Sequence, residues 1–231
     1  AEVSALPSIV MRRRSPRHVY IASAVLMRRL CERDDRRKAI FYGEIARGTA
    51  AEAADPLTRA SILNALGVTL VADSQFKSAI EVFDEGLSVL ATLDDSEQLR
   101  SLRAALLANL GGAKVLRGDH AEGVTILENV LHELEEPYDR AEAFLDLCFG
   151  YMELQQTDVA ERYGRRALQL ACVPRQVRNA NHLLGEICLR TDRYEEADAM
   201  FDVVAGFYPD FRNVKQLLVA VDLCSVVNWK A

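Results

Sequence analysis

Hydrophobic and polar residues recur along this chain with the period of amphipathic α-helices, and no stretch alternates with the period of a β-strand. Prolines such as Pro56 and Pro209 follow apolar runs, where proline ends one helix or begins the next. These signals predict an all-α chain of consecutive helices. Their expected ranges are 16–31, 35–53, 56–72, 76–92, 96–116, 120–135, 138–154, 158–171, 174–190, 194–207 and 211–229.

A spacing of small and aromatic residues repeats along these helices. After a leucine–glycine pair, an aromatic residue follows the glycine at +9, alanine at +12 and a second aromatic at +16. Two copies have this pattern: Leu66-Gly67 with Phe76, Ala79 and Phe83, and Leu184-Gly185 with Tyr194, Ala197 and Phe201. The small +12 residue continues as the series Ala39, Ala79, Gly123, Ala160 and Ala197. Small side chains let two helices cross closely, so each copy predicts a helical hairpin.

This spacing resembles the tetratricopeptide repeat, and the copy from Gly185 to Pro209 resembles it most closely. The resemblance implies a right-handed superhelix of about five helical hairpins plus a C-terminal helix. It also implies that the first helix of each hairpin lines a concave face. We expect residues 1–17 to form an extended arm or linker and residues 18–231 to form the repeat domain. Long, uneven repeats of this kind also resemble those in regulatory domains of bacterial transcription regulators, including the peptide-sensing group.

The first helix of each hairpin has a face that we expect to be free. Positions −3, +1 and +4 from the glycine lie away from the packing positions. We predict that a protein or peptide partner binds to residues at these positions and to Asn109, whose amide suits the backbone of an extended peptide. The predicted binding residues are Asn64, Val68, Val71, Asn109, Gly112, Val115, Leu145, Phe149, Met152, His182, Glu186 and Leu189. The alternative is that these residues contact only the next hairpin or the C-terminal helix. The face lacks the cations that an acidic peptide tail requires.

The segment 217–229 is apolar on every side, which is typical of a helix buried on more than one face. Terminal repeats usually present a polar outer face. We therefore predict dimerisation through Leu218, Val221, Val226 and Trp229. The alternative is a helix that caps the repeat stack.

Charge is distributed unevenly along the chain. The net charge is −6, but residues 1–50 contain eleven basic and five acidic residues, a balance of +6. An arginine-rich segment without a helix-turn-helix or other nucleic-acid motif favours a solvated face or contact with an acidic surface. We expect no direct contact with nucleic acid.

Sequence motifs for catalysis are missing. The four histidines have no metal-ligand spacing, and no phosphate loop, G-x-S-x-G motif or dinucleotide fingerprint occurs. The five cysteines have no C-x-x-C spacing and are interpreted as small buried side chains in a reducing cytoplasm. We expect no signal peptide, no membrane helix, no cofactor and no enzymatic activity.

These observations favour a bacterial, cytoplasmic scaffold that binds a protein or peptide on the concave face of its repeats. The alternative is the ligand- or peptide-sensing and dimerisation domain of a bacterial helix-turn-helix transcription regulator. In that case a DNA-binding domain would precede residue 1. The two interpretations share the same predicted groove.

Overall fold

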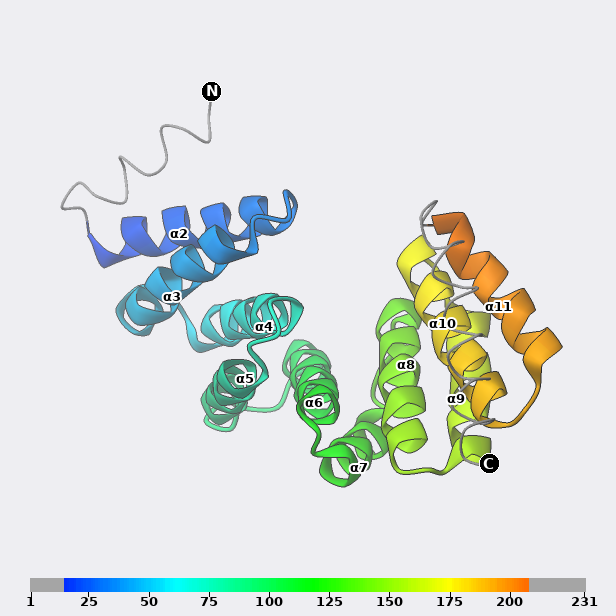
Figure 1. Cartoon of the computed structure of the whole chain (residues 1–231). Coiled ribbons are helices and arrows are strands. Elements are labelled where there is room, and N and C mark those ends of the chain that lie inside the picture. The colour runs from blue at the N-terminus through cyan, green and yellow to red at the C-terminus, as the bar shows by residue number, and fades with distance from the viewer. Residues whose placement is uncertain (1–14, 208–231) are drawn as a thin grey trace. The chain divides into compact units, whose positions relative to one another are not determined.

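The computed structural model describes residues 15–207, which form ten helices and no strand (Figure 1). Consecutive helices pair as five helical hairpins. The bounds are Pro16–Cys31 (α2), Arg36–Ala53 (α3), Pro56–Ala72 (α4), Phe76–Leu90 (α5), Glu97–Arg117 (α6), His120–Val130 (α7), Pro137–Glu153 (α8), Thr157–Leu170 (α9), Pro174–Arg190 (α10) and Tyr194–Phe207 (α11). The helix predicted at 211–229 lies outside the described residues.

The predicted helix boundaries agree with these bounds to within two residues, except at the end of α7. That helix ends at Val130, not at residue 135, and a turn follows it. Glu136 is extended and precedes Pro137, the first residue of α8, because proline disfavours a helical conformation in the residue before it. At α4 the Asp55 carboxylate accepts a hydrogen bond from the Thr58 backbone N–H at 3.0 Å, which caps the helix.

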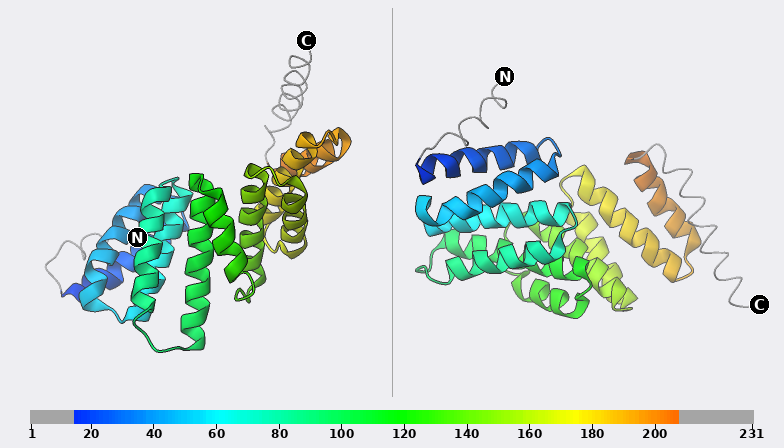
Figure 2. Two further views of the ribbon diagram at one scale, coloured as in Figure 1. Left: turned by 90° about the horizontal axis from the view of Figure 1, so that it is seen from below. Right: turned by 60° about the vertical axis from the view of Figure 1, so that its left-hand side comes forward.

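The chain divides into two compact units, the first ending at Leu134 and the second beginning at Glu135. In the first unit, the hairpins α2–α3, α4–α5 and α6–α7 pack against one another in chain order, and α4 also contacts α6. Figure 2 shows helices α2 to α5 of this unit stacked side by side. In the second unit, α8–α9 packs against α10–α11 through contacts of α10 with both α8 and α9.

The +16 aromatic residue lies directly on the glycine of its own copy. A Cβ atom added to Gly67 would lie 2.3 Å from Cε1 of Phe83, and one added to Gly185 would lie 2.8 Å from Cε1 of Phe201. Both rings are buried, at 0% and 1% exposure. Glycine is therefore required at this position because the ring occupies the space of a side chain.

Two other hairpins have the same contact between the glycine position and position +16 of the repeat. In them the larger residue stands at the glycine position and glycine stands at +16. In the fourth hairpin, Cys148 takes the glycine position, and a Cβ atom on Gly164 at +16 would lie 3.0 Å from its Sγ. In the first hairpin, Met27 lies twelve residues before Ala39, and a Cβ atom on Gly43 at +16 would lie 2.9 Å from its Sδ. One small residue at either position is enough for the two helices to pack closely.

Ser23 on α2 has a buried hydroxyl group with no hydrogen-bond partner among the described residues. An unsatisfied buried hydroxyl is unfavourable, and alanine is the better helix former. We expect Ser23→Ala to raise the free energy of unfolding by about 1 kcal/mol in urea denaturation. Ser88→Ala is the control, because the exposed Ser88 hydroxyl donates to the Asp84 carbonyl oxygen at 2.9 Å. Equal effects of the two substitutions would contradict this interpretation.

Candidate partner-binding groove

An apolar groove of about 630 Å³ lies in the first unit between α2 and α4, the first helices of two consecutive hairpins. Small and aliphatic side chains dominate its surface. The lining residues are Ala24, Val25, Met27, Arg28, Cys31, Asp34, Arg36, Thr58, Ser61, Ile62, Ala65, Val68, Thr69 and Ala72. Its volume lies within the range of ligand-binding pockets in proteins.

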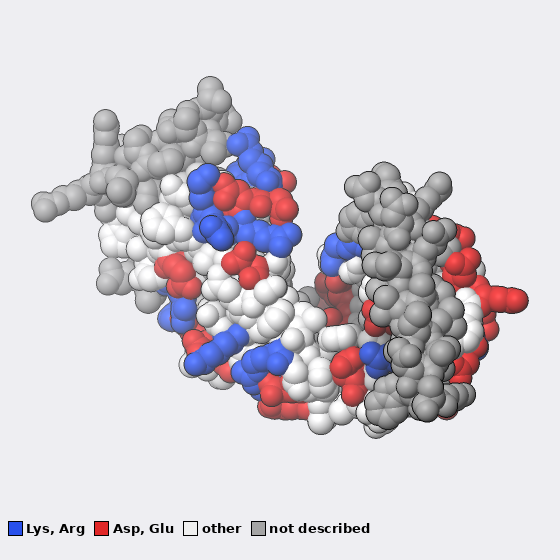
Figure 3. All heavy atoms as spheres, viewed as in Figure 1, with Lys and Arg blue, Asp and Glu red and all other residues white. Residues whose placement is uncertain are grey.

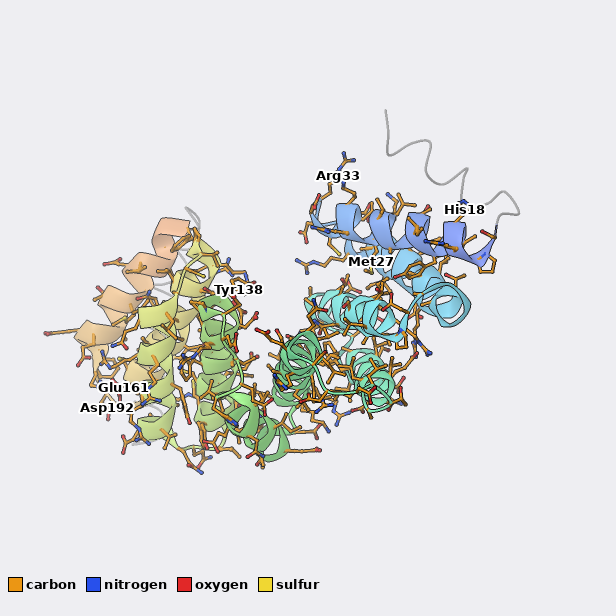
Figure 4. The ribbon with its side chains drawn as sticks, turned by 180° about the vertical axis from the view of Figure 1, so that it is seen from behind. His18, Met27, Arg33, Tyr138, Glu161 and Asp192 are labelled. Atoms are coloured by element: carbon orange, nitrogen blue, oxygen red, sulfur yellow. The ribbon has the colours of Figure 1, made fainter. Side chains whose placement is uncertain are left out.

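The groove exists because small residues line α4 where it faces α2. Ser61, Ala65 and Ala72 recur at helical spacing on that face and leave space beside the helix. Met27 is buried at 3% exposure and lies on the side of α2 toward the neighbouring helices (Figure 4). By contrast, Val25 and Val68 are 44% and 46% exposed. Two exposed valines beside an apolar surface are the type of patch that binds a partner.

Charged residues lie at the end of the groove where α2 ends. The Arg36 guanidinium donates from Nη1 to the Ala72 carbonyl oxygen at 2.6 Å and from Nε to Asp34 at 2.8 Å, which stabilises the C-terminus of α4. Arg28 is exposed and forms no ion pair within residues 15–207. Figure 3 shows basic side chains gathered around this end of α2, with acidic ones among them. The groove therefore has an uncompensated positive charge at its rim.

One thiol also lines the groove. The Sγ atom of Cys31 lies 3.3 Å from the Thr69 hydroxyl oxygen, so the C-terminal part of α2 is joined to α4 there. Cys31 is exposed, whereas Cys148 in the second unit is buried, and burial raises the pKa of the Cys148 thiol to about 12. The two thiols therefore differ in accessibility.

Four residues of the predicted face in the first unit are at least partly exposed: Asn64, Val68, Val71 and Asn109. Val68 lines the groove. The Nδ2 atom of Asn109 on α6 donates a hydrogen bond to Oδ1 of Asn64 on α4 at 2.8 Å, so the structure joins these two side chains. Each amide keeps one further polar group for another partner. Val71 is half-buried and packs against the core of the unit.

The prediction that the side chains of Val115 and Met152 lie on the free, partner-binding face is wrong. Val115 is buried because α6 and α7 cross closely, and a Cβ atom on Gly123 would lie 2.5 Å from its Cγ2. Met152 is 1% exposed and packs with Cys148, Ala160 and Ile187. Position +4 is thus a packing position in these hairpins. Gly112 and Leu145 are buried as well.

The remaining predicted residues of the described chain lie in the second unit. Phe149 is half-buried and packs against the cluster around Cys148, and half-buried Leu189 packs against the cluster around Phe201. The His182 Nδ1 atom lies 3.3 Å from the Glu186 carboxylate, and its ring contacts Phe201 edge to face. Leu218, Val221, Val226 and Trp229 lie outside the described residues, so their predicted role in dimerisation stays a prediction.

Comparison with known proteins gives the fold. No protein-family model and no curated protein sequence matches the chain. Solved structures do match. A thermophilic TPR protein from Thermus thermophilus has a TM-score of 0.58 at 18% identity, covering 89% of this chain and 99% of its own. BtubC from P. vanneervenii has a TM-score of 0.67 at 18% identity, covering 91% of both chains.

A third solved structure with a similar fold is that of the Rap conjugation gene regulator of plasmid pLS20, which is described in complex with the Phr* peptide. Its TM-score is 0.68 at 14% identity, covering 84% of this chain and 56% of the regulator. The fold is that of tetratricopeptide-repeat proteins. The predicted hairpins of this fold are confirmed, and the all-α class with them.

Sequence reasoning missed the α2 side of the groove, although the tetratricopeptide register contains the signal. Counting back twelve residues from Ala39 gives Met27 as the glycine position of the first repeat. Positions −3, +1 and +4 from Met27 are Ala24, Arg28 and Cys31, and all three line the groove. The missing glycine at residue 27 concealed this register.

The part of the tetratricopeptide array that the structure describes contains no group of three His, Cys, Asp or Glu side chains placed to hold a metal ion. Among residues 15–207, no helix is both long and apolar enough to cross a membrane.

Proposed function

We propose that this chain is a non-catalytic binding scaffold that holds an apolar segment of a protein or peptide partner between α2 and α4. The observation that carries the proposal is the apolar groove with Val25 and Val68 exposed at its surface. Burial of such side chains against a partner contributes about 25 cal/mol of favourable free energy for each Å² removed from water, which opposes the entropic cost of association.

A peptide occupant is compatible with both interpretations of the sequence. A scaffold would hold a segment of a protein partner, and the sensing domain of a transcription regulator would hold a free peptide. The Rap regulator, which has a similar fold, is described with a peptide bound. In this chain, the amide pair Asn64–Asn109 lies on α4 and α6 and offers a further donor and acceptor to a peptide backbone.

The test is selection of binders from a random peptide library, followed by affinity measurement with fluorescence anisotropy. We expect the selected peptides to be rich in large apolar residues. Val68→Asp should weaken their binding about tenfold or more, because a carboxylate would lose its hydration against an apolar peptide. The substitution should leave helicity and melting temperature nearly unchanged, since Val68 is 46% exposed.

Phe41→Asp is the matched control for this experiment. Phe41 lies on α3, is 59% exposed and does not line the groove. Its substitution introduces the same charge on the same unit, and peptide affinity should stay within about twofold of the wild type. Equal losses in the two variants, or no selected peptide that binds better than its scrambled sequence, would rule out the groove as the binding site.

A further inference from the structure

Helix α11 has an exposed apolar strip on its outer side. Val203 and Phe207 are 41% and 39% exposed, and Ala199 and Gly206 are exposed at neighbouring positions of the same face. A Cβ atom on Gly206 would meet no other atom within 4 Å. The spacing 199, 203, 206 and 207 corresponds to one side of an α-helix. This strip, hereafter the α11 strip, is of the kind that docks into an apolar groove.

Acidic residues lie beside the α11 strip. Helix α11 contains Glu195, Glu196, Asp198 and Asp202 and no lysine or arginine. Glu195, Asp198 and Asp202 are exposed and follow one another at spacings of three and four residues, which places them on one side of the helix. Figure 3 shows acidic side chains along the outer side of α11.

Helix α2 has the opposite charge. It contains Arg17, Arg28 and Arg29 and no acidic residue. Arg28 lines the groove without an ion pair in the described part of the chain. Arg33 projects away from the end of α2 and is exposed (Figure 4). A negatively charged amphipathic helix is therefore complementary to this groove in both its apolar and its charged parts.

We propose that the α11 strip of a second copy of this chain occupies the groove between α2 and α4. This inference rests on the proposed function of the groove and names its occupant. Val203 and Phe207 of one copy would contact Val25 and Val68 of the other. Small residues along α4, such as Ala65, let another helix approach closely. The carboxylates of α11 would then face Arg28, which lines the groove.

The two surfaces are different patches of the same chain, so the contact is head-to-tail. Each copy in a pair keeps one free surface, either a groove or an α11 strip. A substitution in the groove and a substitution in the α11 strip therefore act on opposite sides of the same contact. This asymmetry allows a test that a symmetric dimer would fail.

The test measures molar mass by analytical ultracentrifugation of the whole chain, across a range of protein concentrations and at low and high salt. Wild-type protein should associate with increasing concentration, and high salt should weaken the association. Val68→Asp and Val203→Asp should each remain monomeric alone. A mixture of the two variants should form a one-to-one dimer, because the intact groove of Val203→Asp receives the intact α11 strip of Val68→Asp.

The same proteins separate failure of this inference from failure of the proposed function. Phe41→Asp should associate like the wild type. A monomeric wild type, or a mixture of the two variants that stays monomeric, overturns the inference. If Val203→Asp then still binds selected apolar peptides and Val68→Asp does not, the groove remains a binding site with another occupant. If none of the proteins binds peptide, the proposed function fails as well.

Discussion

Gly67→Ala should lower the free energy of unfolding of the first unit by about 3 kcal/mol. A methyl group at this position would lie 2.3 Å from Cε1 and 2.6 Å from Cζ of Phe83. The Phe83 ring is fully buried and cannot move without displacing its neighbours in the core. Overpacking of this kind exceeds the gain of about 1 kcal/mol that alanine normally gives over glycine inside a helix. Urea denaturation followed by far-UV circular dichroism measures the effect.

Gly48→Ala on α3 is the matched control. Gly48 is exposed, and no atom lies within 4 Å of the position that its Cβ would take. Only the helix propensity changes, so the free energy of unfolding should rise by about 1 kcal/mol. The two substitutions are chemically identical, but we expect changes of opposite sign in the free energy of unfolding. A Gly67→Ala protein as stable as Gly48→Ala would show that the ring does not occupy the glycine position.

Asp146→Asn should raise the free energy of unfolding by about 2 kcal/mol at pH 8 and change it little at pH 4. Burial raises the pKa of Asp146, the negative charge of Glu142 adds to the rise and Arg175 opposes it, and together they bring this pKa to about 7. One pKa unit corresponds to about 1.4 kcal/mol. We expect a smaller gain in the free energy of unfolding than the full pKa shift implies, because Asp146 is half-buried and water screens its charge.

The direction of the pH dependence follows from the raised pKa. Below the ordinary pKa of an aspartate, the carboxyl is protonated in both folded and unfolded chains and has no effect. As pH rises toward 7, the unfolded chain releases this proton first, so the wild type loses stability. Asparagine cannot ionise and avoids this loss. Asp84→Asn, which makes the same substitution at an exposed position on α5, is the control variant. A constant difference between Asp146→Asn and wild type at all pH values would contradict the assignment.

The helices were predictable because their signals are local. Apolar periodicity, proline positions and capping residues such as Asp55 depend on a few neighbouring residues. The repeat spacing also predicted which helices pair as hairpins, whereas the contact between Gly67 and Phe83 inside one hairpin is a finding of the structure. This contact also explains why the first and fourth hairpins were difficult to recognise. In them, Met27 and Cys148 occupy the position at which the pattern requires glycine.

The groove was only partly predictable, because openness depends on the size of residues on other helices. Val68 is accessible beside α2, whereas Val115 at a position assigned to the same face is buried. Gly123 on α7 causes that difference by letting the helix approach closely. A rule applied to each first helix separately does not include these neighbours. The position of Arg28 at the rim could be predicted only from the register of the first repeat, which was not recognised because Met27 replaces the glycine.

In the first unit, each hairpin packs on the hairpins next to it in the chain. Stability in such an array is approximately a sum of hairpin and nearest-neighbour terms, and the ends open most easily. Amide hydrogens of α2 and α3 should therefore exchange faster than those of the central hairpin α4–α5. An occupant of the groove would contact α2 and α4 together and so oppose opening of the end hairpin. Slower hydrogen exchange in α2 and α3 would report binding even without a measurable change in shape.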